Sequence, residues 1–240
     1  MGLKVDSQMS NVESMTIESA RDLVANQALW PRVRDFLWDF VPQIHESWLE
    51  GVAGRESLDS GLEDAKSHVQ RLKSSPGLKR FILDSLGVEP VSHAFPKNDG
   101  SRLLLLDAAT IESIAKWLGA LACSDQLRKV MDGATVRELK AALSGVYPEV
   151  FGYTAYFNVA AKSVEDVKNT EEIVAIGFKM LFSQFADLPS SLVSRLKFKL
   201  PRSLCGFLVL CDKKEWAIPS STILKLFKLK FPEAYSLCCS

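Results

Sequence analysis

Apolar residues recur at intervals of three and four along much of this 240-residue chain, and this period limits the fold more than any other feature. The clearest case follows Asp107, where one helical stripe lies opposite Glu112 and Lys116. Such a stripe is typical of a helix buried on one face. Its members are Ile111, Ile114, Ala115, Leu118, Leu121 and Ala122.

Comparable patterns predict further helices over much of the chain. The S/T-x-x-E spacing that caps a first helical turn occurs at Ser10, Ser60 and Thr135. The one plausible strand is 207–211. The sequence therefore predicts an all-α, orthogonally packed multi-helix globule with at most one short strand pair. The expected helices span residues 10–28, 31–40, 60–72, 76–86, 125–131, 135–143, 163–186, 189–196 and 220–230, and Pro232 is expected to close the last.

Proline, asparagine and glycine are concentrated between residues 88 and 102, which predicts the strongest loop in the chain. We therefore expect a flexible tail at 1–11, an N-terminal helical region at 12–90, a loop at 91–102 and a second helical region at 103–240. The two helical regions are expected to form one compact unit. The apolar pattern of 163–186 covers much of the helix surface, which favours a place at the centre of the bundle.

The formal net charge is zero, but the charges are unevenly distributed. Residues 1–70 contain six basic and twelve acidic residues, whereas 195–230 contain nine basic residues against Asp212 and Glu215. The basic end could attract an acidic partner. Alternatively, both ends are solvated faces, or they pack against each other. The sequence pI of about 6.8 argues against a nucleic-acid partner.

No motif for catalysis, metal binding or nucleotide binding is present. The three histidines are far apart in sequence, and the five cysteines lack metal-ligand spacing. Cys123 falls off the apolar stripe, so it is expected to be a surface or edge thiol. The acidic pairs 165–166 and 171–172 are expected to be solvated charge. We therefore expect no enzyme activity, no catalytic residues, no metal and no cofactor.

Aromatic and basic residues supply the candidates for protein contacts. Trp30 and Trp117 border apolar stripes and are expected in the core, whereas Trp38 and Trp216 are expected to be exposed. Large amphipathic rings are common interface anchors. The candidate protein-interaction residues are Lys213, Lys214, Trp216, Lys225, Lys228 and Lys230.

The N-terminus is polar and lacks the apolar core of a secretion signal, and no apolar run approaches the roughly 18 residues of a membrane span. We therefore expect no direct membrane insertion.

Three segments resemble a known family. Residues 103–143 contain Trp117-Leu118-Gly119, then Leu127-Arg128, then a short helix at 136–143. This order is similar to the central block of the SctK (YscK) family, an accessory component of bacterial type III secretion. SRLKFKLP at 194–201 and ILKLFKLKFPEA at 223–234 resemble the family's ending, although this chain departs from the family's R-L-x-L-P pattern. The resemblance covers 103–234, and residues 1–90 match only in being helical and tryptophan-containing.

The resemblance implies a non-catalytic adaptor in the sorting platform beneath the injectisome, a machine for protein transport in virulence. Its implied partners are the cytoplasmic domain of the inner-membrane ring protein and the pod protein that leads to the ATPase complex. The implied location is the bacterial cytoplasm, peripheral to the inner membrane. The alternative is another helical protein-binding module, such as a secretion chaperone or regulator.

Overall fold

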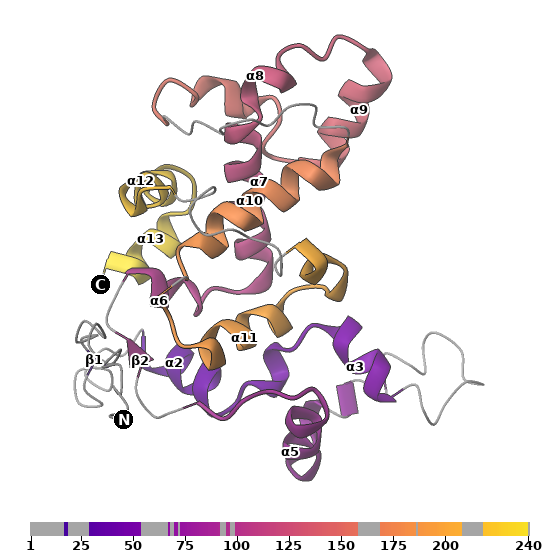
Figure 1. Cartoon of the computed structure of the whole chain (residues 1–240), viewed down its shortest axis with the longest axis vertical. Helices are drawn as coiled ribbons and strands as arrows, with labels where there is room; N and C mark the ends of the chain where they lie inside the picture. The colour runs from indigo at the N-terminus through magenta and orange to yellow at the C-terminus, as the bar shows by residue number, and fades with distance from the viewer. Residues whose placement is uncertain are drawn as a thin grey trace, which may run out of the picture.

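The structure is a computed structural model that describes residues 17–18, 29–53, 67, 70–71, 73–91, 95–96, 99–157, 169–185, 187–207 and 218–239. Within these ranges the chain is mostly helical, which confirms the all-α prediction (Figure 1). The α-helices are α2 Trp30–Leu37, α3 Glu46–Ala53, α5 Pro76–Ser85, α6 Asp99–Leu103, α7 Ala108–Ala122, α8 Ser124–Leu127, α9 Gly133–Ala142, α10 Thr170–Ser183, α11 Ser190–Lys199, α12 Ser220–Lys230 and α13 Pro232–Cys239.

Three short 3-10 helices and two short strands complete the described elements. The 3-10 helices are η1 Val41–Gln43, η2 Glu149–Gly152 and η3 Arg202–Phe207. Strand β1, Ile17–Glu18, pairs antiparallel with β2, Phe95–Pro96. This is the single short strand pair that the sequence allowed, but it forms elsewhere than expected. Phe207 of the expected strand belongs to η3, and residues 208–211 lie outside the described residues.

The predicted stripe after Asp107 forms α7, and its larger members are buried. Asp107 caps the helix, because its carboxylate accepts a hydrogen bond from the Thr110 backbone N–H at 2.8 Å. Helix α10 crosses α7 at the centre of the molecule (Figure 1). The prediction that this apolar helix lies centrally is therefore confirmed, although it begins at Thr170, with Asn169 as its cap.

Two glycines allow α7 and α10 to approach with their backbones in contact. A β-carbon on Gly119 would lie 2.9 Å from the carbonyl carbon of Ile173 and closer still to its oxygen. A β-carbon on Gly177 would lie 2.8 Å from the Gly119 nitrogen and would overlap the Ala115 carbonyl. Real Cβ atoms do not reach such separations, so both positions require glycine as the helices now lie.

Two buried basic side chains on α11 bind backbone carbonyls of α2 and of the segment after α6. Arg195 Nη1 donates to the carbonyl oxygens of Phe36 and Leu37, at 2.7 and 3.0 Å. Lys199 Nζ donates to the carbonyl oxygens of Leu104 and Leu106, at 2.8 and 2.9 Å. The last carbonyls of a helix have no intrahelical partner and bear the negative end of the helix dipole. Arg195 therefore provides hydrogen-bond donors to the last carbonyls of α2, while Lys199 provides them to the carbonyls of the turn after α6.

A pH-dependent stability follows from the burial of Lys199. Burial, which outweighs the opposing charge of Asp107, and to a smaller extent the charge of Arg32 together lower the pKa of this amine from 10.5 to about 7. Between pH 7 and 10.5 the unfolded chain therefore binds more protons than the folded one, so stability rises with pH. Relative to Lys199→Met, the wild-type free energy of unfolding should rise on the order of 2 kcal/mol between pH 7 and 9.

Urea unfolding of both proteins at pH 6, 7, 8 and 9 measures this difference. Below pH 7 the difference should stay flat, because Lys199 is protonated in both states. Burial, followed by the charge of Glu172, raises the pKa of Cys123 to about 12 and gives an opposite slope at alkaline pH. Cys123 is present in both proteins, so its contribution cancels in the difference. Parallel pH profiles for the two proteins would contradict the assignment.

The structure corrects several local predictions. Residues 17–18 form β1 instead of part of a helix, and the expected loop at 91–102 contains β2 and the start of α6. Asp132, not Thr135, caps α9, because its carboxylate accepts from the Thr135 N–H at 2.8 Å. Pro232 begins α13 instead of only closing α12. The capping residues expected at Ser10 and Ser60 lie outside the described residues.

Candidate interaction surfaces

Helix α12 has the predicted amphipathic form. Ile223, Leu226 and Phe227 are buried, while Lys225 and Lys228 face solvent. Neither lysine has an ion-pair partner within the part of the chain that the structure describes. Leu229 beside them is 53% exposed. We name Lys225, Lys228 and Leu229 the α12 surface.

Lys230 differs from the other two lysines because its amine has partners within the same chain. Its amine is hydrogen-bonded to Glu149, and it lies 4.8 Å from the centre of the Trp117 ring and 4.2 Å from that of Tyr153. Burial alone would lower the pKa of Lys230, but its bonds to Glu149 and Tyr153 raise it overall. Lys230 therefore fastens α12 to α7 and η2 and offers little to a partner.

The other three candidate residues cannot be placed. Lys213, Lys214 and Trp216 lie outside the described residues, so their proposed part in an interface stays a prediction.

A second exposed apolar site lies on α5. Ile82 is buried on its inner face, whereas Leu78 and Phe81, one turn apart, are exposed, Phe81 by 57%. An ion pair of 2.6 Å between Lys79 and Asp39 fixes the helix to the segment after α2. We name Leu78 and Phe81 the α5 surface. It lies at the opposite end of the molecule from α8 and α9 (Figure 1).

The tryptophan predictions hold where they can be tested. Trp117 is buried in the core, and Trp30 packs partly buried against it. Trp38 is 49% exposed, and its ring centre lies 5.7 Å from that of Trp30. Trp48 packs against the core and donates from Nε1 to the Leu200 carbonyl at 2.9 Å.

Cys123 is not the surface thiol that its place off the stripe predicted. It lies buried at the junction of α7 and α8 and lines a pocket together with the first turn of α10. Burial, followed by the nearby charge of Glu172, raises the pKa of Cys123 to about 12. A thiol that stays protonated is a poor nucleophile, so the geometry offers no activated cysteine here.

Among the described residues, no three histidine, cysteine or carboxylate side chains gather closely enough to hold a metal ion. Across the same residues, no helix has both the length and the apolarity to cross a membrane.

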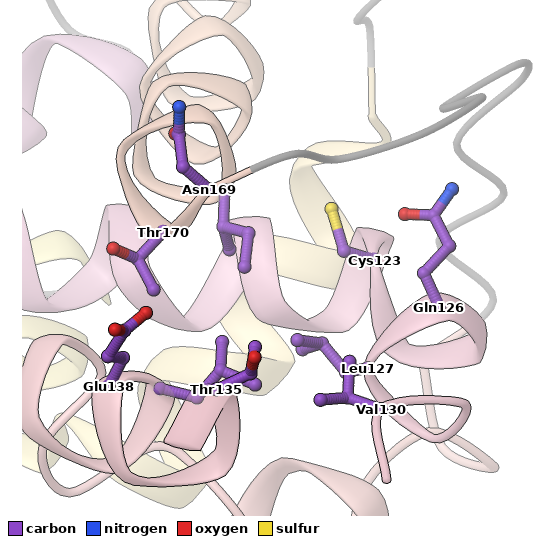
Figure 2. A pocket seen from close by; sticks show the side chains of 10 residues that line it. Cys123, Gln126, Leu127, Val130, Thr135, Glu138, Asn169 and Thr170 are labelled. Carbon is purple, nitrogen blue, oxygen red and sulfur yellow. The ribbon is translucent and has the colours of Figure 1, made fainter. Parts of the chain in front are cut away.

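A pocket of about 160 Å³ opens between α8, α9 and the first turn of α10 (Figure 2). Its apolar lining comes from Leu127, Val130, Leu139 and Ile173. Its polar lining comes from Cys123, Gln126, Thr135, Glu138, Asn169 and Thr170.

Sequence reasoning did not find this pocket or the bonds that hold Lys230. Both join side chains from segments that are far apart along the chain, and periodicity describes one segment at a time. The one available signal was the interruption of the helical pattern near Gly133, which separates α8 from α9 and leaves room between them.

Comparison with family models gives a match to "YOP proteins translocation protein K (YscK)" over residues 40–152. The matched region includes η1, α7, α8, α9 and η2, so it overlaps the central block identified from the sequence. It also includes residues 40–90, which had shown no specific resemblance, and it ends before the resemblance at 194–234. No curated protein and no solved structure gives a significant match. Over residues 40–152, slightly less than half of its length, the chain is therefore similar to the YscK family of type III secretion components.

Proposed function

We propose that this chain is a non-catalytic adaptor of the type III secretion sorting platform. It would bridge the cytoplasmic domain of the inner-membrane ring protein and the pod protein that leads to the ATPase complex. The match of residues 40–152 to the YscK family model supports a place in this system. The observation that carries the bridging role is the presence of exposed apolar side chains on two separate helices, α12 and α5.

The α12 surface suits an acidic partner. Leu229 provides an apolar contact, while Lys225 and Lys228 provide two charges that have no ion-pair partner among the described residues. Charged residues around an apolar contact steer association and select the partner. This basic helix is the part of the expected interface that the structure describes, and Lys230 is removed from it by its bond to Glu149.

The α5 surface suits a second, more apolar contact. Leu78 and Phe81 stand on one helix face, and an exposed aromatic side chain is a frequent anchor in protein interfaces. Helices α5 and α12 lie on different parts of the molecule (Figure 1). Two partners could therefore bind together without competing for one surface.

Binding of the purified ring-protein domain and the purified pod protein tests this proposal. The double variant Lys225→Glu and Lys228→Glu should weaken one partner at least about tenfold and change the other less than about twofold. Phe81→Asp should weaken the other partner, because it places a charge at an apolar contact.

Lys140→Glu is the matched control, since Lys140 is also an exposed helical lysine but belongs to α9. This control should bind both partners like the wild type. Failure of the wild type to bind either protein would refute the adaptor role. Loss of both partners in one folded variant would refute the separation of the two surfaces.

A further inference from the structure

The pocket between α8, α9 and α10 has a hydrogen-bond acceptor at each end and apolar side chains between the two acceptors. Figure 2 shows Gln126 at one end and Glu138 at the other, with Leu127 and Val130 along the floor. The Oε1 atom of Gln126 is buried and has no hydrogen-bond partner among the described residues. A buried acceptor without a partner is costly, and a ligand that brings a donor would remove that cost.

The charge at the pocket is negative. Glu138 is the one charged residue among those that line it, and the neighbouring Glu172 acts on Cys123 in the pocket wall. The first turn of α10 also reaches the pocket and would by itself favour an anion. However, Asn169 accepts the Glu172 N–H at 2.9 Å, and Glu171 and Glu172 lie in that turn, so the helix end is already compensated.

These features of the pocket fit a basic side chain better than an apolar or an acidic one. Lysine and arginine side chains have an aliphatic stem that packs on apolar surface and a cationic head that donates to carboxylates. A neutral apolar side chain would fill the floor but would leave Gln126 Oε1 without a donor. An acidic side chain would face Glu138 directly.

We propose that this pocket receives a lysine or arginine side chain from a segment of a partner protein. The stem would lie along Leu127, Val130 and Leu139, and the head would bond the Glu138 carboxylate. A backbone N–H of the same segment would reach Gln126. The identity of the partner rests on the proposed adaptor function, whereas the chemistry of the pocket does not.

Nuclear magnetic resonance titration of the whole chain with capped arginine, N-acetyl-arginine methylamide, tests the chemistry without any partner. We expect saturable shifts on the order of 1–10 mM, confined to the amides of the residues that line the pocket. The neutral probe N-acetyl-norleucine methylamide should give much smaller shifts. Glu138→Lys should abolish the arginine response, whereas Lys140→Glu, an exposed change on the same helix, should preserve it.

The absence of shifts at the lining residues, or equal shifts in wild type and Glu138→Lys, would overturn the proposal. Glu138→Gln provides a milder second variant, and circular dichroism establishes that each variant is folded. With the purified ring-protein domain and pod protein, Glu138→Lys should weaken one of them about tenfold or more. Unchanged binding of both would exclude a partner contact here. If the wild type binds neither, the adaptor function fails, and the titration still decides what the pocket binds.

Discussion

Replacing Gly119 by alanine should destabilise the protein by about 3 kcal/mol or more, a large part of the roughly 5–15 kcal/mol that holds a typical domain together. The added β-carbon would overlap the Ile173 carbonyl, and 2.9 Å would separate it from the carbonyl carbon. Because the obstacle is backbone in a helix interior, no side chain can rotate away. Helix α10 would have to move off α7, which would open the centre of the core.

Urea unfolding measures this effect as a lower midpoint, or as the absence of a cooperative transition. Gly177→Ala should act in the same way, because its β-carbon would overlap the Ala115 carbonyl. Gly77→Ala is the matched control, since Gly77 is also helical and nothing lies within 4 Å of its added β-carbon. This control should be neutral or stabilising by up to about 1 kcal/mol. Equal midpoints for Gly119→Ala and Gly77→Ala would contradict the close crossing.

The difference between these glycines could not be predicted from the sequence. Helical period predicted α7 and its buried stripe, because the signal lies within one segment. The Leu118-Gly119 step entered only as part of a family resemblance. The physical reason for glycine at position 119 is the close approach of Ile173 and Gly177, which are more than fifty positions away in the sequence. Period states which face of a helix is buried but not how closely the neighbouring backbone approaches.

At the candidate interface, too, the sequence pattern predicts the helix but not the contacts that its side chains make with distant segments. The amphipathic pattern of 220–230 correctly predicted a helix with lysines on one side. It grouped Lys230 with Lys225 and Lys228, because all three are basic and close in sequence. Lys230 has a different role from the other two because it contacts Glu149 and Tyr153, which lie in another part of the chain. Likewise, the pattern of its own helix predicts an exposed Cys123, whereas this side chain is buried in the folded chain.

Arg195→Ala should cost about 3 kcal/mol, because two buried helix-terminal carbonyls would lose their donor and the packing of the side chain would be lost as well. The guanidinium donates to Phe36 and Leu37 at the end of α2, and it lies 5.2 Å from the centre of the Phe40 ring. Burial lowers the pKa of Arg195 to about 10, so the group stays charged at pH 7. The free energy of unfolding from urea titration measures the loss.

A comparison with Arg195→Met separates the hydrogen bonds from the packing. Methionine keeps much of the apolar stem but donates nothing, and it removes a buried charge whose own desolvation is unfavourable. We expect Arg195→Met to remain about 2 kcal/mol below wild type, because leaving the Phe36 and Leu37 carbonyls unsatisfied outweighs the recovered desolvation. Arg137→Ala, an exposed change on α9, should stay within about 0.5 kcal/mol of wild type. If Arg195→Met matched wild type, α11 would hold α2 by packing alone. The buried cation would then be unnecessary for joining α2 to the rest of the molecule.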